Sequence, residues 1–283
     1  MKILSESHQR DVNKTQKIEL FKHFQAQFDE LDQFLIETKK EQPSWMDDIF
    51  KEYTKILTKK INPKQSIKVF SMDLFSQTNW KVIHNYLDEL TVLQQAMLSF
   101  LDIVNSPLHN KNFLDENDIF EAQFDNYVRY GYYHVYYFFH AMMNLHGKEI
   151  AYELANNIAI KFFSKPRPNG KNFDELVPFM DWMGNLCKTT HDFTIGEIEN
   201  GSVIMNTHEC LYGEALKEVE DPNLMYYLIC FCDFYSAPKY NDNFVLTRNK
   251  TILQNHGICD FCYHDKRKES EIVHPDEKFW NSL

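Results

Sequence analysis

Hydrophobic residues recur every three or four positions over most of the first 165 residues, and this spacing predicts helices. Between positions 21 and 35 one apolar stripe repeats at this interval, and a longer ladder with the same spacing runs from Val82 to Val104. The members of the first stripe are Phe21, Phe24, Phe28, Leu31 and Leu35. We therefore expect the N-terminal part of the chain to be helical, with a loop over 106–116.

The stretch 117–163 is the most aromatic part of the chain and is apolar on nearly every helical face. A helix of this kind is usually central and surrounded by other helices. Gly147 is expected to divide it from a second helix. The segment 164–172, SKPRPNGKN, has two prolines and a glycine and is the best linker in the sequence.

After the linker the pattern changes to an alternation of apolar and polar positions, which is typical of strands. Asn200-Gly201 predicts a hairpin turn between two such strands. Asp221-Pro222 predicts the start of a helix, and the segments 244–248 and 258–264 predict a second hairpin. The predicted fold class is α+β, a helical N-terminal part followed by an antiparallel β-sheet with packed helices.

We expect a helical region over 1–116, an α+β domain over 117–265 and a charged tail over 266–283. In the 283-residue chain a hydrophobic fraction of 43% is sufficient for a substantial core. A formal charge of −11 makes nucleic acid an improbable partner, because phosphate binding needs a basic face. The first residues do not resemble a signal peptide, and no apolar run is long enough to span a membrane. We therefore expect a cytoplasmic protein with no membrane partner and with reduced thiols.

All six cysteines lie in the last third of the chain, and two of them are in the segment NHGICDFCYHD, residues 255–265. Cys259 and Cys262 have the spacing of a zinc knuckle, with His256 and His264 beside them. A closed zinc site needs a second pair, and the sequence has no second Cys-x-x-Cys. On a strand the two cysteines would also face opposite ways. We therefore expect no metal.

The same segment has two other interpretations. Strand alternation sends Cys259, Phe261 and Tyr263 to one face, and Asp260, Cys262 and His264 to the other. A catalytic cysteine needs a depressed pKa, for which His256 or Arg248 are the nearby positive groups in the sequence. The alternative is that each cysteine is a small buried apolar residue.

Three pieces of the C-terminal half resemble the L-2-amino-thiazoline-4-carboxylic acid hydrolase family in their order. They are CLYGEALKEVEDPNL from Cys210, YLICFCDFY with Cys232-Asp233, and LTRNKTILQNHGICDF with Arg248 and Cys259-Asp260. The resemblance covers about residues 125–265. The last hairpin also resembles 4-vinyl-reductase-like ligand-binding domains, which have an α+β fold.

The family's reaction opens a thiazoline ring without a cofactor, and the resemblance implies roles for the matched positions. The nucleophile candidates are Cys210, Cys232 and Cys259, while Asp233 or Asp260 would orient or protonate. Arg248 would hold a substrate carboxylate, and His256 is a further candidate for substrate binding.

The aromatic helix offers a second candidate surface. Tyr130, His134 and Tyr137 are spaced four and three apart and therefore share one helical face. They would form a pocket wall for a small planar substrate, or they are core residues with a buried histidine.

The predicted function is hydrolysis of a small cyclic amidine or thiazoline, assisted by cysteine. Two alternatives remain. One is a small-molecule-binding or sensor module on the same fold, and the other is a scaffold whose acidic helical half binds another protein. The sequence leaves the oligomeric state open.

Overall fold

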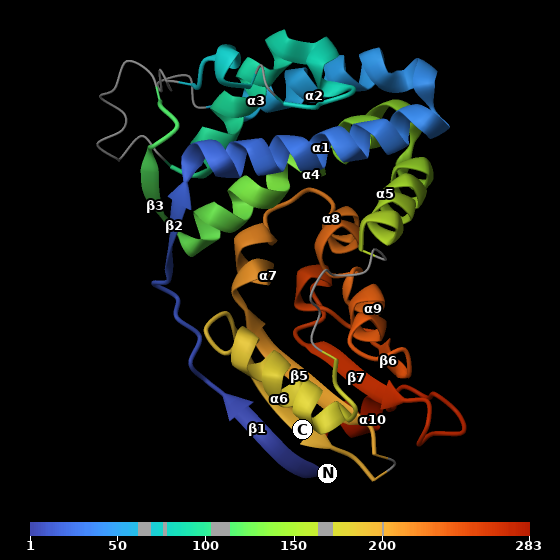
Figure 1. Ribbon diagram of the computed structural model, residues 1–283. Helices are drawn as coiled ribbons and strands as arrows, with labels where there is room; N and C mark the ends of the chain where they lie inside the picture. The colour runs from blue at the N-terminus through green and yellow to red at the C-terminus, as the bar shows by residue number, and fades with distance from the viewer. Residues whose placement is uncertain (62–68, 76–77, 103–113, 164–171, 200) are drawn as a thin grey trace. The chain divides into compact units, whose positions relative to one another are not determined.

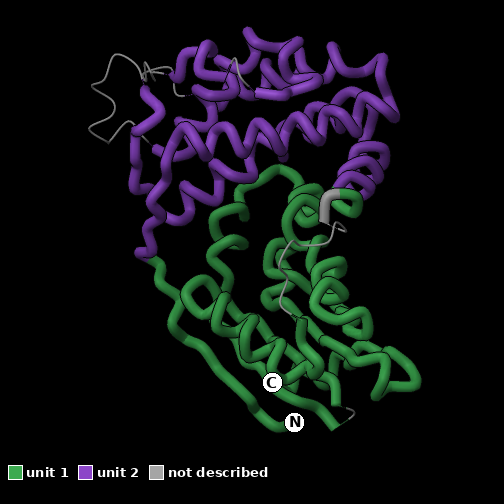
Figure 2. The backbone as a smooth tube through the Cα atoms, in the orientation of Figure 1, with its two compact units in different colours: residues 1–12, 159–283 green, residues 13–158 purple. Residues whose placement is uncertain are grey.

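The computed structural model describes residues 1–61, 69–75, 78–102, 114–163, 172–199 and 201–283 (Figure 1). The chain forms two compact units, which Figure 2 shows in different colours. Unit 1 comprises Met1–Val12 and Ala159–Leu283, and unit 2 comprises Asn13–Ile158. These borders differ from the domain limits expected at 116 and 265. The expected division into domains stays a prediction. Most of the predicted linker and of the predicted loop lies outside the described residues.

Unit 2 is mainly helical, as the apolar spacing predicts. Its elements are β2 (Thr15–Glu19), α1 (Leu20–Glu41), η1 (Pro43–Trp45), α2 (Met46–Lys60), η2 (Met72–Phe75), η3 (Ile83–Tyr86), α3 (Leu87–Phe100), β3 (Ile119–Gln123), α4 (Phe124–His146) and most of α5 (Lys148–Phe163), whose residues from Ala159 on belong to unit 1. The expectation of helix throughout is wrong at β2 and β3, which pair antiparallel and lead directly into α1 and α4. Five residues are too few for a period of two to be distinguished from one of 3.6.

The core of unit 2 is aromatic. Phe24 and Phe28 of the predicted stripe are fully buried, and the Phe24 ring packs edge-on against Tyr130 of α4 at 5.5 Å between centroids. Helix α4 is buried at every position from Tyr133 to Met142, which confirms that it is central. Gly147, with a φ of 95°, ends this helix where the sequence predicts a break.

Unit 1 contains a five-stranded antiparallel sheet in the order β1-β4-β5-β7-β6. Its elements are β1 (Lys2–Ser7), α6 (Leu176–Cys187), β4 (His191–Glu197), β5 (Val203–Cys210), α7 (Leu211–Leu216), α8 (Pro222–Ile229), α9 (Asp233–Ser236), η6 (Ala237–Lys239), β6 (Phe244–Thr247), η7 (Ile252–Gln254), β7 (Cys259–Asp265) and α10 (Glu277–Trp280). Both predicted hairpin pairings are present, β4 with β5 and β6 with β7. The α+β fold class is confirmed.

The N-terminal residues supply an edge strand that the sequence did not predict. Strand β1 pairs with β4, from Lys2 opposite Glu197 to Ser7 opposite Phe193. The pairing joins residues almost 200 positions apart, and no local pattern in a six-residue segment indicates such a partner.

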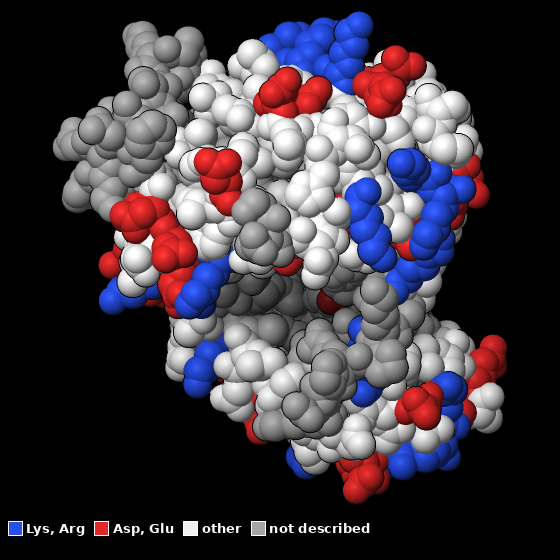
Figure 3. All heavy atoms as spheres, turned by 45° about the horizontal axis from the view of Figure 1, so that its top comes forward, with Lys and Arg blue, Asp and Glu red and all other residues white. Residues whose placement is uncertain are grey.

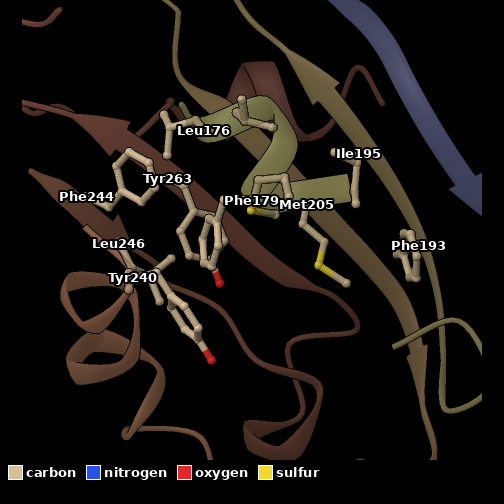
Figure 4. Close-up of a cluster of buried hydrophobic side chains, with 12 residues drawn as sticks. Leu176, Phe179, Phe193, Ile195, Met205, Tyr240, Phe244, Leu246 and Tyr263 are labelled. Carbon is tan, nitrogen blue, oxygen red and sulfur yellow. The ribbon is translucent and has the colours of Figure 1, made fainter. Parts of the chain in front are cut away.

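The two faces of the sheet have separate cores. Helix α6 lies on one face, where Phe179 packs among Met205, Tyr240, Phe244 and Tyr263 (Figure 4). On the other face Ile204 and Cys262 pack with Trp280 of α10. We call these the α6 face and the α10 face.

Candidate functional site

An ion pair on the α6 face joins the strand β6 to the start of helix α9. Arg248 directly follows β6 and continues the inward alternation of Phe244 and Leu246. Its Nη1 donates to Oδ2 of Asp233 at 2.6 Å, and its Nη2 donates to the carbonyl oxygen of Cys230 at 2.8 Å. Two separate segments therefore hold the guanidinium in place.

Three aromatic rings surround this guanidinium. Its central carbon lies 5.4 Å from the ring centroid of Tyr226, 5.0 Å from that of Phe234 and 4.9 Å from that of Phe261. The Arg248 side chain is only 1% exposed, so the rings take the place of water around the charge. The Nε of Arg248 is buried and has no partner among the described residues, whereas Nη1 and Nη2 make the two donations described above.

Asp233 is the candidate acid or base. Burial raises the pKa of its carboxyl, and this outweighs the lowering by Arg248. The side chain nevertheless keeps 35% of its surface accessible, so it is surrounded by protein atoms yet still reachable. A carboxyl that solvent can reach and whose pKa is raised is a better proton acceptor than an ordinary aspartate, which suits acid–base catalysis.

Four thiols lie close enough to Asp233 for its charge to raise their pKa further. They are Cys187, Cys210, Cys230 and Cys259. Cys210 also raises the pKa of Cys259, and both thiols raise that of Cys230. The structure thus brings two of the three predicted nucleophile candidates together around the ion pair.

Cys232, the third candidate, directly precedes Asp233. Its thiol donates to the carbonyl oxygen of Ile229 at 3.0 Å, and it lies near enough to Tyr263 to contribute to the raised pKa of that phenol.

The pKa values of these thiols are raised, whereas a catalytic cysteine is expected to have a lowered pKa. Burial raises the pKa of Cys210 to about 11 and that of Cys259 to about 12, and it raises that of Cys230 well above the usual range. Arg248 lowers the pKa of Cys230 and Cys259, and Asp233, directly beside it, raises both and offsets part of this effect. These thiols are therefore protonated at neutral pH.

Local structure explains where two of the sulfur atoms lie. Cys210 ends β5 and is the N-cap of α7, with its Sγ accepting from the backbone N–H of Gly213 at 3.4 Å. Cys259 Sγ accepts from the backbone N–H of Ile252 at 3.2 Å. Each sulfur atom thus accepts a hydrogen bond from a backbone N–H group of a neighbouring turn.

Thr207 lies beside Cys259 and was missed by the sequence analysis. It is directly opposite Cys259 in the β5–β7 pairing, on the α6 face. Its hydroxyl is buried and has no hydrogen-bond partner among the described residues. A threonine on a strand is common, so the sequence carries no signal that this hydroxyl is unsatisfied.

Asp260 and His256 do not join the thiols. The alternation in β7 is as predicted, and it places Asp260 on the α10 face. There the carboxylate accepts from the backbone N–H groups of Asn249 and Lys250 at 2.9 and 2.6 Å. His256 is exposed on the turn before β7. The catalytic role suggested for Asp260 therefore has no geometric support.

The possible zinc site is also divided by the sheet. Cys259 belongs to the α6 face, whereas Cys262 packs with Ile204 and Trp280 on the other. Among the residues that the structure describes, no group of three or more metal-ligating side chains is arranged to hold an ion.

Tyr130, His134 and Tyr137 lie in unit 2 and are all buried. The Nδ1 of His134 donates to the carbonyl oxygen of Tyr130 at 3.2 Å, and burial lowers the pKa of this imidazole to about 4. The ring is therefore neutral. Tyr137 packs against Phe100 and Tyr133. These contacts are those of core residues.

The comparisons with known proteins agree with this region. Residues 128–263 match the family model described as L-2-amino-thiazoline-4-carboxylic acid hydrolase, which confirms the predicted resemblance for the C-terminal half. No curated protein and no solved structure matches the chain.

Two further findings concern possible partners. Every helix in the described part of the chain is too short or too polar to cross a bilayer. On the face drawn in Figure 3, described acidic and basic side chains occur in separate small groups of both signs.

Proposed function

We propose that this protein is a hydrolase that opens a small cyclic amidine or thiazoline of the L-2-amino-thiazoline-4-carboxylate type. The observation that carries the proposal is the Asp233–Arg248 pair among clustered thiols, inside the region that matches the family model. A cofactor is not needed for this chemistry.

The reaction adds one water to the ring. The oxygen of water forms a bond to C2, the bond from C2 to the ring sulfur breaks, and the sulfur receives a proton. The product is an N-carbamoyl cysteine. The steps need a base to take a proton from the nucleophile and an acid to protonate the leaving sulfur.

Asp233 supplies the base. Its raised pKa makes the carboxylate a better proton acceptor than an ordinary aspartate, and Oδ1 receives no hydrogen bond from the described residues. Arg248 fixes the carboxylate through Oδ2. The protonated Asp233 then returns the proton to the departing sulfur.

A thiol can replace water as the first nucleophile. Because the pKa of Cys210 is about 11 and that of Cys259 about 12, either thiol attacks C2 only if a base removes its proton as the bond forms. The bond from C2 to the ring sulfur then breaks, and the ring sulfur receives that proton from Asp233. Water next adds to C2, and the bond from C2 to the cysteine sulfur breaks, which restores the thiol. Without a thiol nucleophile, Asp233 activates water directly, so both routes depend on Asp233 and only the first depends on a cysteine.

The test is turnover of L-2-amino-thiazoline-4-carboxylate, with N-carbamoyl cysteine measured by mass spectrometry. We expect Asp233→Asn to lower kcat by about a hundredfold or more. Cys210→Ser and Cys259→Ser identify a thiol nucleophile, since a serine hydroxyl at the same place is far less reactive. Cys262→Ser is the matched control, because this thiol lies on the α10 face.

The raised pKa values favour a second function, a binding module without turnover. Such a module needs no activated thiol, and the described cysteines with a resolved pKa shift all have it raised. Binding of the thiazoline by calorimetry, with no product formed and with binding unchanged in Asp233→Asn, would support the module over the hydrolase.

A further inference from the structure

A chain of five hydrogen-bonded side chains runs along the α10 face, opposite the thiols. Glu269 Oε2 lies 3.0 Å from His264 Nδ1, and His264 Nε2 lies 2.8 Å from Thr247 Oγ1. Thr247 Oγ1 lies 2.9 Å from His274 Nδ1, and His274 Nε2 lies 3.0 Å from Asp260 Oδ2. We call these five residues the back-face chain.

The back-face chain is shielded from water. The side chains of His264, Glu269 and Asp260 are 0%, 3% and 1% exposed, and that of His274 is 11% exposed. An unpaired polar group in a buried site is costly, so these hydrogen bonds favour one arrangement of the five side chains.

Two further side chains contact the back-face chain. Ser202 Oγ lies 3.0 Å from His264 Nδ1 and donates to Glu269 Oε1 at 2.8 Å. The Nε1 atom of Trp280 lies 3.1 Å from both His274 Nε2 and the carbonyl oxygen of Pro275.

The chain ends at the turn that follows Arg248. Asp260 Oδ1 accepts from the backbone N–H groups of Asn249 and Lys250, the next two residues. The other oxygen of the same carboxylate is held by His274. The imidazole of His274 thus holds the carboxylate of Asp260, and this carboxylate holds the turn at Asn249 and Lys250.

We propose that His274 is a positioning residue for the Asp233–Arg248 pair, acting through Asp260 and the turn that this carboxylate holds. Its effect on catalysis rests on the proposed function, whereas the anchoring of the turn does not.

The anchoring is tested by amide hydrogen exchange on the intact protein. A glutamine at 274 can place an amide N–H near the Nε2 position and keep the bond to Asp260, whereas an asparagine reaches only the Nδ1 position. We expect His274→Asn to speed exchange at Asn249 and Lys250 about tenfold, and His274→Gln to change it less than about threefold. Exchange at Met205, in the middle of the sheet, should stay unchanged in both. Equal acceleration in the two variants, or none in His274→Asn, would overturn the anchoring.

The activity measurement separates the two proposals. If the wild type hydrolyses the thiazoline, His274→Asn should lower kcat about tenfold with KM nearly unchanged, and His274→Gln should keep most of the activity. If the wild type does not hydrolyse it while the exchange results are as expected, the proposed function fails and the anchoring by His274 stands. A loss of kcat in His274→Gln as large as in His274→Asn would contradict a role through Asp260.

Discussion

Nη1 of Arg248 donates to Oδ2 of Asp233 at 2.6 Å, and this contact joins the end of β6 to the first residue of α9. The guanidinium is almost fully buried among aromatic rings, and the carboxylate is the only acidic side chain that it contacts among the described residues. The stability of this part of unit 1 therefore depends on the charge of Asp233.

Replacing Asp233 by asparagine leaves a buried cation without its counter-charge. We expect Asp233→Asn to lower the free energy of unfolding by about 2 kcal/mol, which is less than for a fully buried pair because the carboxylate is partly screened by solvent. Urea unfolding at pH 7 measures the change. Asp242→Asn, at an exposed position, is the control and should change it by less than about 0.5 kcal/mol. An equal loss in both variants would show that the pair has no special role in stability.

The buried imidazole of His134 predicts a dependence of stability on pH. Its pKa is about 4 in the folded protein against an ordinary value of 6.5, so the unfolded chain binds the proton first as the pH falls. The stabilisation is complete above pH 6.5 and is lost as the pH falls towards 4, by up to about 3 kcal/mol. In His134→Asn the amide can still donate to the Tyr130 carbonyl, and the loss of stability between pH 6.5 and 4.5 should be smaller. Urea unfolding at several pH values tests this, and an identical slope in both proteins would contradict it.

The Thr207 hydroxyl has no hydrogen-bond partner among the described residues, so we expect its removal to weaken substrate binding without lowering stability. Thr207→Val keeps the shape and removes a buried polar atom that has no partner in the described structure, so thermal stability should be unchanged or higher. If this hydroxyl bonds the substrate, KM for the thiazoline should rise about tenfold, and Thr207→Ser should restore it. A lower melting temperature in the valine variant would indicate that the hydroxyl already has a structural partner.

The close approach of α6 to the sheet predicts a steric effect at Gly184. A Cβ atom there would lie 2.9 Å from Cδ1 of Ile195 and 3.3 Å from Cζ of Phe193. Gly184→Ala must therefore displace buried side chains, and we expect it to lower the free energy of unfolding by about 1–3 kcal/mol. Gly131→Ala, in α4, meets nothing within 4 Å and should be neutral or stabilising. Chemical denaturation of both variants measures the difference, and similar stabilities would contradict the close packing.

Local patterns predicted the fold class well because they report on neighbouring residues. The helical spacing gave α1 and α4, Asp221 is the N-cap of α8 as expected, and the alternation around Cys259 separates the two faces of β7 correctly. Strand β1 was not predicted, since its partner β4 is remote in the sequence.

The chemistry of the site was harder to predict than its location. The order of motifs indicated Cys210, Asp233, Arg248 and Cys259, which the structure brings together. The direction of the thiol pKa values was not predictable, because it depends on burial and on how completely Asp233 offsets Arg248. His274 lies in a tail without any pattern, so its bond to Asp260 could be found only in three dimensions.

The position of β1 also has a consequence for how the molecule is made and divided. Unit 1 takes its edge strand from the first residues and the rest of its sheet from beyond residue 190, so during synthesis this strand must wait for most of the chain before it finds its partner. A fragment restricted to residues 128–263 would lack this strand and leave the backbone N–H and C=O groups of β4 unpaired at an exposed sheet edge. Strands from other copies can pair with such an edge, so the truncated product is expected to aggregate where the whole chain does not.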